Sequence, residues 1–156
     1  MCQICYGRHK AKIKPWQGKK TRKAVESLAS QMMEVFYIPY PDTKEGKKQW
    51  TRRYGLNAYY SGKHWAVRKA DADYWHRLAR IEMDRQGVRE EPFQSPVVLS
   101  FYWNDRLDCS NHAAMGKMIE DAMVGRVISG DSQKYVKGIE HYFWDGNSIK
   151  ICVREV

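Results

Sequence analysis

Hydrophobic and polar residues alternate near the C-terminus, which is the period of a half-buried β-strand. The stretch from Ser148 to Glu155 carries this pattern. Its hydrophobic positions are Ile149, Ile151 and Val153. Lys134 to Phe143 has the composition of a preceding strand, and Asp145-Gly146 between the two is a strong turn signal. The pattern therefore predicts a C-terminal β-hairpin.

Hydrophobic residues spaced by three and four positions predict two helices. The longer helix should run from about Lys63 to Gln86 and end at Gly87. Its apolar face is expected to comprise Val67, Ala70, Tyr74, Leu78 and Ile81. The shorter helix should run from about Asn111 to Met123. It is expected to bury Met115, Met118, Ile119 and Ala122.

The remaining elements complete an α+β domain. Strands are expected from Val35 to Tyr40 and from Pro96 to Trp103, and residues 41–56 are interpreted as an exposed basic loop. The simplest packing is a two-layer sandwich, a mixed sheet with helices on one face. This domain should span residues 34–156, preceded over residues 1–33 by a basic arm with a short helix from Thr21.

Charge is distributed unevenly along the chain. Residues 1–70 carry a net charge of +12 and residues 71–156 carry −3, out of +9 for all 156 residues. A basic half is typical of nucleic-acid binding, and the alternative is a solvated face that aids solubility. The apolar runs are too short for a membrane span and no secretory signal is evident, which predicts a cytoplasmic protein without a membrane partner.

The four cysteines are expected to be reduced thiols. Cys2 and Cys5, with His9 close behind, form half of a zinc motif, but a complete site needs four ligands. Ordinary thiols are therefore the preferred interpretation, and zinc is not expected.

The most informative stretch runs from residue 105 to residue 131, where acidic residues gather around one lysine of a basic chain. These residues are Asp105, Asp108, Asp121, Asp131 and Lys117. Carboxylates repel a phosphate backbone unless a divalent cation lies between them, and Asp oxygens with water suit Mg²⁺. The pattern favours a nuclease whose metal reverses the local charge. The acidic side chains are expected to converge at one end of the sheet.

The order of these motifs resembles the RusA-type Holliday junction resolvases, over about residues 36–156. The likeness begins at Ile38-Pro39-Tyr40-Pro41, continues in Leu56-Asn57-Ala58-Tyr59-Tyr60, and is followed by the basic segment Lys63–Lys69. The central family signature is similar to Asp108-Cys109-Ser110-Asn111, Lys117-Met118-Ile119-Glu120-Asp121 and Gly130-Asp131-Ser132-Gln133. Ser110 replaces the family's second carboxylate, and the interval from Asn111 to Lys117 is three residues longer than usual, close to one helical turn.

The resemblance implies a homodimer that nicks a four-way DNA junction symmetrically, with Mg²⁺ or Mn²⁺ as cofactor and no small-molecule substrate. Asp108, Asp131 and Lys117 are the implied catalytic residues, and Asp108 and Asp131 are also implied ligands of the metal. Asp105 or Asp121 would supply the carboxylate that Ser110 lacks. Two alternatives stay open: Asp121 forms an i, i+4 salt bridge with Lys117, and Asp105 is a turn residue at the strand end.

DNA contacts are expected from the basic half, with Asn57 and Arg106 in addition. The basic candidates are Lys44, Lys47, Lys48, Arg52, Arg53, Lys63, His64, Arg68 and Lys69. His64 and His112 are expected to face DNA or solvent and not a metal. Trp103 is expected in the core, with insertion into an open junction as the alternative. Two other functions remain: a non-catalytic nucleic-acid-binding protein with an N-terminal zinc site, or a RusA-like nuclease for flaps or forks.

Overall fold

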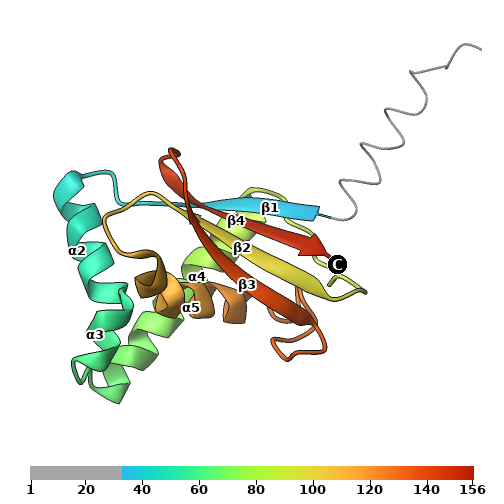
Figure 1. Ribbon diagram of the computed structural model, residues 1–156, viewed down its shortest axis with the longest axis horizontal. Helices are drawn as coiled ribbons and strands as arrows, with labels where there is room; N and C mark the ends of the chain where they lie inside the picture. Colours follow the sequence, from blue (N-terminus) through green and yellow to red (C-terminus); the bar gives the residue numbers. More distant parts are fainter. Residues whose placement is uncertain (1–32) are drawn as a thin grey trace, which may run out of the picture.

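The structure, a computed structural model that describes residues 33–156, places one mixed β-sheet over a layer of helices (Figure 1). The strands are β1 (Met33–Pro39), β2 (Val97–Trp103), β3 (Val136–Phe143) and β4 (Ser148–Glu155). The helices are α2 (Lys44–Tyr54), α3 (Leu56–Tyr60), α4 (Trp65–Arg85) and α5 (Ala113–Met123), and the 3-10 turn η1 (Cys109–His112) leads into α5. The predicted two-layer α+β class is confirmed. The expected basic arm and its helix lie outside the described residues, apart from Met33 in β1.

The strand order is β1-β4-β2-β3. β4 runs antiparallel to both β1 and β2, whereas β3 runs parallel to β2. The C-terminal strands β3 and β4 are joined by the expected turn at Asp145-Gly146, but β2 lies between them, so the expected direct pairing is corrected. Five of the seven residues of β2 are buried. The strand lies between β4 and β3, so both of its edges are hydrogen-bonded to a neighbour. β3, with exposed Ile139 and Phe143, takes the sheet edge.

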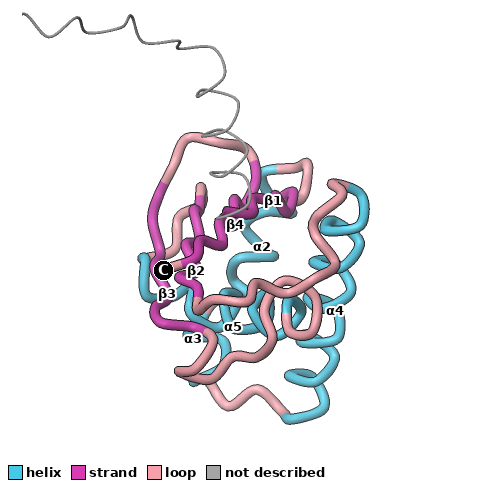
Figure 2. Tube along the Cα trace, turned by 90° about the vertical axis from the view of Figure 1, so that its right-hand side faces the viewer, coloured by secondary structure: helices cyan, strands magenta, loops and turns pink. Residues whose placement is uncertain are grey.

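The parallel pair β2 and β3 requires a crossover, and the crossover contains η1 and α5. It carries α5 across the sheet face that holds the core, and the perpendicular view shows helices α4 and α5 on this side of the strands (Figure 2). The predicted buried residues of α5 and of β4 are all confirmed. Each fully buried aliphatic side chain of this layer contributes roughly 1.5–3 kcal/mol to the free energy of unfolding.

α4 occupies nearly the predicted range, but the predicted buried face is wrong. Val67, Tyr74 and Ile81 are exposed, and the helix instead buries a neighbouring face. The buried residues are Asp71, Trp75, Ala79, Glu82 and Met83. Two of these carry charge, and partners from other positions bind them: Lys63 binds Asp71, and Gln86 binds Glu82. The spacing of hydrophobic residues alone therefore does not identify the buried face of α4.

The predicted loop over residues 41–56 is also corrected, because α2 and the start of α3 occupy it. The Thr43 side chain accepts a hydrogen bond from the Gly46 amide and caps α2. Trp50 and Tyr54 lie one turn apart on the buried side of the helix, and Trp50 packs 4.7 Å from Trp75. Trp50 and Tyr54 are the aromatic residues that anchor this helix. Because most of its other residues are charged or polar, the sequence shows no repeating hydrophobic period there.

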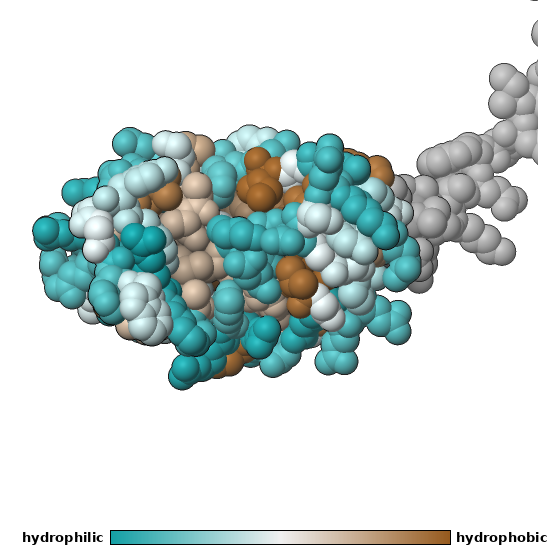
Figure 3. Space-filling view, turned by 90° about the horizontal axis from the view of Figure 1, so that it is seen from below, coloured by the Kyte–Doolittle hydropathy of each residue, from teal (hydrophilic) through white to brown (hydrophobic). Residues whose placement is uncertain are grey.

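Hydrophilic residues cover most of the surface seen from the helix side, and the hydrophobic ones there form separate patches (Figure 3). None of the helices in residues 33–156 combines the length and the apolar character that a membrane span requires.

Candidate active site

Lys117, in the middle of α5, lies at the centre of the acidic cluster. Its Nζ atom is 2.7 Å from Asp121 Oδ1 and 2.6 Å from Asp131 Oδ2. Glu120 Oε2 lies 3.4 Å from the same nitrogen. The salt-bridge alternative for Asp121 is thus observed. Glu120 was missed as a site residue, although its i, i+3 spacing from Lys117 could have indicated it.

The electrostatics of this cluster keep Lys117 charged. Burial on its own would lower the pKa of Lys117, but the hydrogen bonds from Lys117 to Asp121 and Asp131 raise it above the ordinary value. Asp131 has a lowered pKa because it accepts a hydrogen bond from Lys117. Burial raises the pKa of Glu120 despite the neighbouring lysine. The site therefore presents a protonated ammonium beside the partly exposed carboxyl groups of Asp121 and Asp131 and the buried carboxyl group of Glu120.

Asp105 belongs to a second, separate constellation at the end of β2. Its Oδ1 atom is 2.9 Å from His112 Nε2 and accepts a hydrogen bond from the Leu107 amide, also at 2.9 Å. The Tyr40 hydroxyl donates to its Oδ2 atom at 3.0 Å. Burial would raise the pKa of Asp105, but the hydrogen bonds, that from His112 foremost, lower it. The alternative that Asp105 is a turn residue is therefore observed.

His112 is buried in the core and is neither exposed nor free to face DNA, which corrects the expectation. Its ring stacks on Trp103 at 4.3 Å between centroids, and its Nδ1 atom lies 3.2 Å from the Cys109 carbonyl oxygen. Trp103 is itself fully buried and donates to His141 Nδ1, which confirms its place in the core. Both residues hold the loop that carries Asp105.

Asp108 is the N-cap residue of η1, is exposed, and makes no capping hydrogen bond with its side chain. Its carbonyl accepts from the Asn111 amide, and its side chain lies 3.5 Å from Asn111 Nδ2. Ser110 is exposed beside it. Lys117 follows four residues after the start of α5, which is about 6 Å along the helix axis. Asp108 therefore lies before η1, whereas Lys117 lies about one helical turn inside α5.

The donor set of the Lys117 cluster suits Mg²⁺, which takes only one or two carboxylates and keeps several waters. Asp121 and Asp131 reach one cationic atom from two different elements, so their oxygens already converge on a cation. These two residues would hold the ion. Within residues 33–156, no group of three or more His, Cys, Asp or Glu side chains has an arrangement that could hold a metal. Cys2, Cys5 and His9, the half zinc motif, lie outside the described residues.

The predicted DNA-contact residues separate into two groups. Some bind the protein itself: Arg53 and Lys63 both contact Asp71, and Lys69 pairs with Asp73 at 2.9 Å. Asp71 is fully buried and was not predicted as a site residue, because the predicted buried face of α4 was the neighbouring one. The remaining predicted contacts have exposed side chains or line a pocket. They are Asn57, Arg52, His64, Lys44, Lys47, Lys48 and Arg106. Arg68 belongs to both groups, since its side chain is exposed but donates to the Lys63 and Tyr59 carbonyls.

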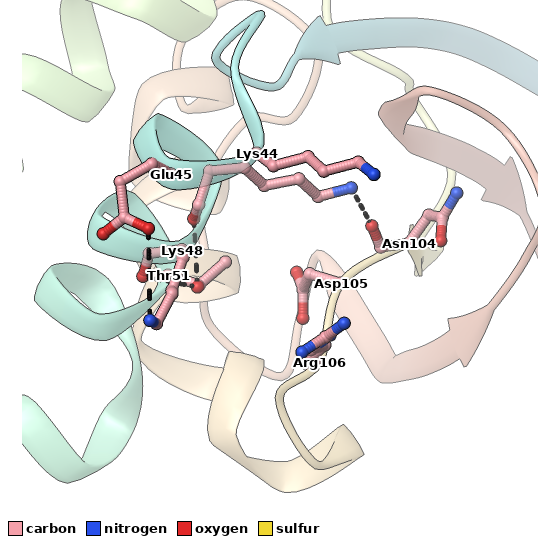
Figure 4. Close-up of a pocket in the computed structure, with 8 residues that line it drawn as sticks. Lys44, Glu45, Lys48, Thr51, Asn104, Asp105 and Arg106 are labelled. Atoms are coloured by element: carbon pink, nitrogen blue, oxygen red, sulfur yellow. Dashed lines mark hydrogen bonds and ion pairs between the residues drawn. The ribbon is translucent and has the colours of Figure 1, made fainter.

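A pocket of about 390 Å³ lies between α2 and the loop after β2 (Figure 4). Four basic residues line it, together with Asp105, Glu45, Thr51 and Asn104. The basic residues are Lys44, Lys47, Lys48 and Arg106. Lys47 donates to the Asn104 carbonyl, and its Nζ atom lies 3.9 Å from the centre of the Tyr40 ring. Burial lowers the pKa of Lys47, and Asp105 opposes part of this shift.

No protein-family model matches this chain, and no curated protein matches it.

Proposed function

We propose that this protein is a metal-dependent endonuclease that cuts branched DNA. In its specific form, it acts as a homodimer that places symmetric nicks across a four-way junction during recombination or repair, since a two-fold protein suits a pseudo-two-fold DNA. Mg²⁺ or Mn²⁺ is the proposed cofactor. The proposed setting is the bacterial cytoplasm, as for a phage-encoded resolvase.

The observation that carries the proposal is the convergence of Asp121 and Asp131 on Lys117 at a partly exposed surface. With Glu120, carboxyl groups outnumber the ammonium three to one. A structural salt bridge needs only one carboxylate. This excess of negative charge, on a chain of net charge +9, would repel a DNA phosphate. A further bound cation would offset the repulsion and let the phosphate approach, which supports a role for a metal ion.

In this proposal Lys117 acts on the scissile phosphate. Its raised pKa keeps the ammonium protonated, so it can donate hydrogen bonds to phosphate oxygens as negative charge develops. Asp121 and Asp131 hold the ammonium in place from two sides, which fixes its direction before DNA arrives. Mg²⁺, when bound, supplies a water of lowered pKa and polarises the phosphate. Asp108, exposed at the start of η1, remains a proposed contributor to the same site.

The basic residues of α2 and of the pocket supply the proposed contacts to the DNA backbone. Lys44, Lys48 and Arg106 project from two sides of the pocket (Figure 4). Each phosphate that such a residue neutralises releases counterions, so binding should weaken steeply as salt is added.

Cleavage of a synthetic four-way junction tests the proposal, with matched duplex, flap and fork substrates alongside. We expect nicking of a branched substrate with Mg²⁺ and none with EDTA. Asp131→Asn and Asp108→Asn should each abolish most nicking. Glu90→Gln, which changes an exposed carboxylate in the loop between α4 and β2, is the matched control and should cut normally.

The branched substrate that is cut fastest distinguishes a junction resolvase from a flap or fork nuclease. Preference for the four-way junction supports a resolvase, and preference for flaps or forks supports a RusA-like nuclease of different specificity. No metal-dependent nicking of any branched substrate would refute the enzyme. Binding without cleavage, together with bound zinc detected by mass or absorption spectrometry, would instead support the non-catalytic protein with a site at Cys2 and Cys5.

A further inference from the structure

Two aromatic side chains stand out on the surface between α3 and α4. Tyr60 is 81% exposed and Trp65 is 71% exposed, the highest values for large hydrophobic side chains within residues 33–156. Aromatic rings usually bury most of their area, so a solvent-exposed pair close in sequence indicates a binding surface.

The turn that carries these rings is held firmly by buried charge. Asp71 is fully buried on α4 and binds Arg53 from α2 at 2.7 Å and Lys63 from the turn at 2.5 Å. Lys63 also donates to the Arg53 carbonyl at 2.7 Å. Gly62 adopts a φ of +86°, which allows the chain to reverse between the two helices.

Arg68 adds a second tie from the first turn of α4. Its guanidinium donates to the Lys63 carbonyl at 2.8 Å and to the Tyr59 carbonyl at 3.2 Å. The backbone on both sides of the turn is therefore fixed to α4. The two rings are presented on a fixed scaffold, which reduces the entropy lost when a ligand binds.

The charge around the rings identifies the kind of ligand. Residues 52–69 contain five Lys and Arg and no Asp or Glu. The His64 ring lies 5.6 Å from the Trp65 ring, tilted by 38°. Arg53, Lys63 and Lys69 are paired with Asp71 or Asp73, but the side chains of Arg53 and Lys69 stay 55% and 69% exposed. Exposed aromatic rings beside exposed cations match the way proteins bind unpaired nucleic acid: bases stack on rings while cations meet the phosphates.

We propose that Tyr60 and Trp65 form a stacking platform for unpaired bases of DNA. In taking branched DNA as the natural ligand, the platform rests on the proposed function, since bases are unstacked where strands cross or separate. Paired bases inside a duplex hide their faces, so the platform distinguishes unpaired from paired DNA. Stacking has no sequence preference, because every base has a flat face.

Binding of a dye-labelled oligothymidylate and of a duplex, measured in EDTA by fluorescence anisotropy, tests the platform without any cleavage. We expect Tyr60→Ala and Trp65→Ala each to weaken single-strand binding by roughly tenfold, with little change for the duplex. The slope of affinity against salt should stay the same, because neither change removes a charge. Trp65→Phe should retain most of the affinity.

Ile81→Ala is the control, since Ile81 is 53% exposed on the same helix but lies outside the basic segment. It should bind like the unaltered protein, and all variants should keep the same Tm. Unchanged single-strand binding in both alanine variants would overturn the platform, as would an equal loss on the duplex. A change in sedimentation without a change in DNA binding would also overturn it and assign the rings to contact between copies. Because EDTA prevents cleavage, failure of the nuclease proposal would leave this result intact.

Discussion

Lys117 Nζ lies 2.6 Å from Asp131 Oδ2, which ties the middle of α5 to the turn that leads into β3. The contact spans the crossover between the two parallel strands of the sheet. Since Asp121 binds the same nitrogen from within α5, the lysine is oriented by both elements. The arrangement holds a positive charge in a fixed position at a partly exposed surface.

Lys117→Met should reduce junction cleavage by about 10²–10³-fold, equivalent to about 3–4 kcal/mol of barrier, and leave junction binding largely intact. The loss follows from removing a donor that stabilises charge in the transition state. Single-turnover cleavage and binding in EDTA measure the two effects separately. Lys137→Met, an exposed lysine of β3, is the control. Normal cutting by the Lys117 variant would exclude the proposed role.

Asp105→Asn should destabilise the fold by about 1–3 kcal/mol at neutral pH, because it removes a buried carboxylate that accepts hydrogen bonds from Tyr40 and the Leu107 amide and faces His112. The pKa of Asp105 is lowered in the folded protein, so its contribution is present above its unfolded pKa. That contribution is lost as the pH falls through the folded pKa. Urea denaturation at several pH values should therefore show the two proteins converging in acid. A constant difference across this range would contradict the assignment.

Asp71→Ala should destabilise the protein by about 3–5 kcal/mol, because it leaves Arg53 and Lys63 without their shared buried partner. Asp73→Ala removes only an exposed pair with Lys69, and should change the free energy of unfolding by about 0.5 kcal/mol or less. Chemical denaturation of the two variants gives the comparison. Similar values would mean that Asp71 does not organise the turn between α3 and α4.

Lys48→Gln should lower the slope of log affinity against log salt by about 0.9, the contribution of one neutralised phosphate. Lys48 is exposed on α2 beside the pocket, and its contact with Glu45 is long, at 4.0 Å. Titrations of the same junction at several salt concentrations measure the slope. Lys137→Gln should leave it unchanged, and an equal effect from both would place the DNA elsewhere.

Sequence reasoning succeeded where a local period repeats without interruption. The hydrophobic face of β4 and the buried face of α5 are both confirmed, because neighbouring residues of one type determine each. The contact between Lys117 and Asp121 is similarly local, being one helical turn. The pairing of Lys117 with Asp121 could therefore be predicted from the spacing of the two residues alone.

Reasoning from local pattern failed where distant residues decide burial. On α4 the charged residue Asp71 is inside because Arg53 of α2 and Lys63 of the preceding turn bind it. In α2 two aromatic residues are enough to hold a highly charged helix, since they meet Trp75 of α4. The hydrophobic period of one segment shows neither the partners of a buried charge nor the contacts between two helices.

By itself the sequence determined the α+β class, most strand and helix positions, and the gathering of acidic residues around Lys117. Only the tertiary structure decided that β2 separates β3 from β4, and that Asp105 turns inward to His112 while Asp131 reaches Lys117. The physical reason is the range of the interactions. Helical faces and turns depend on residues a few positions apart, whereas strand order and the partners of buried charges depend on residues brought together only by folding.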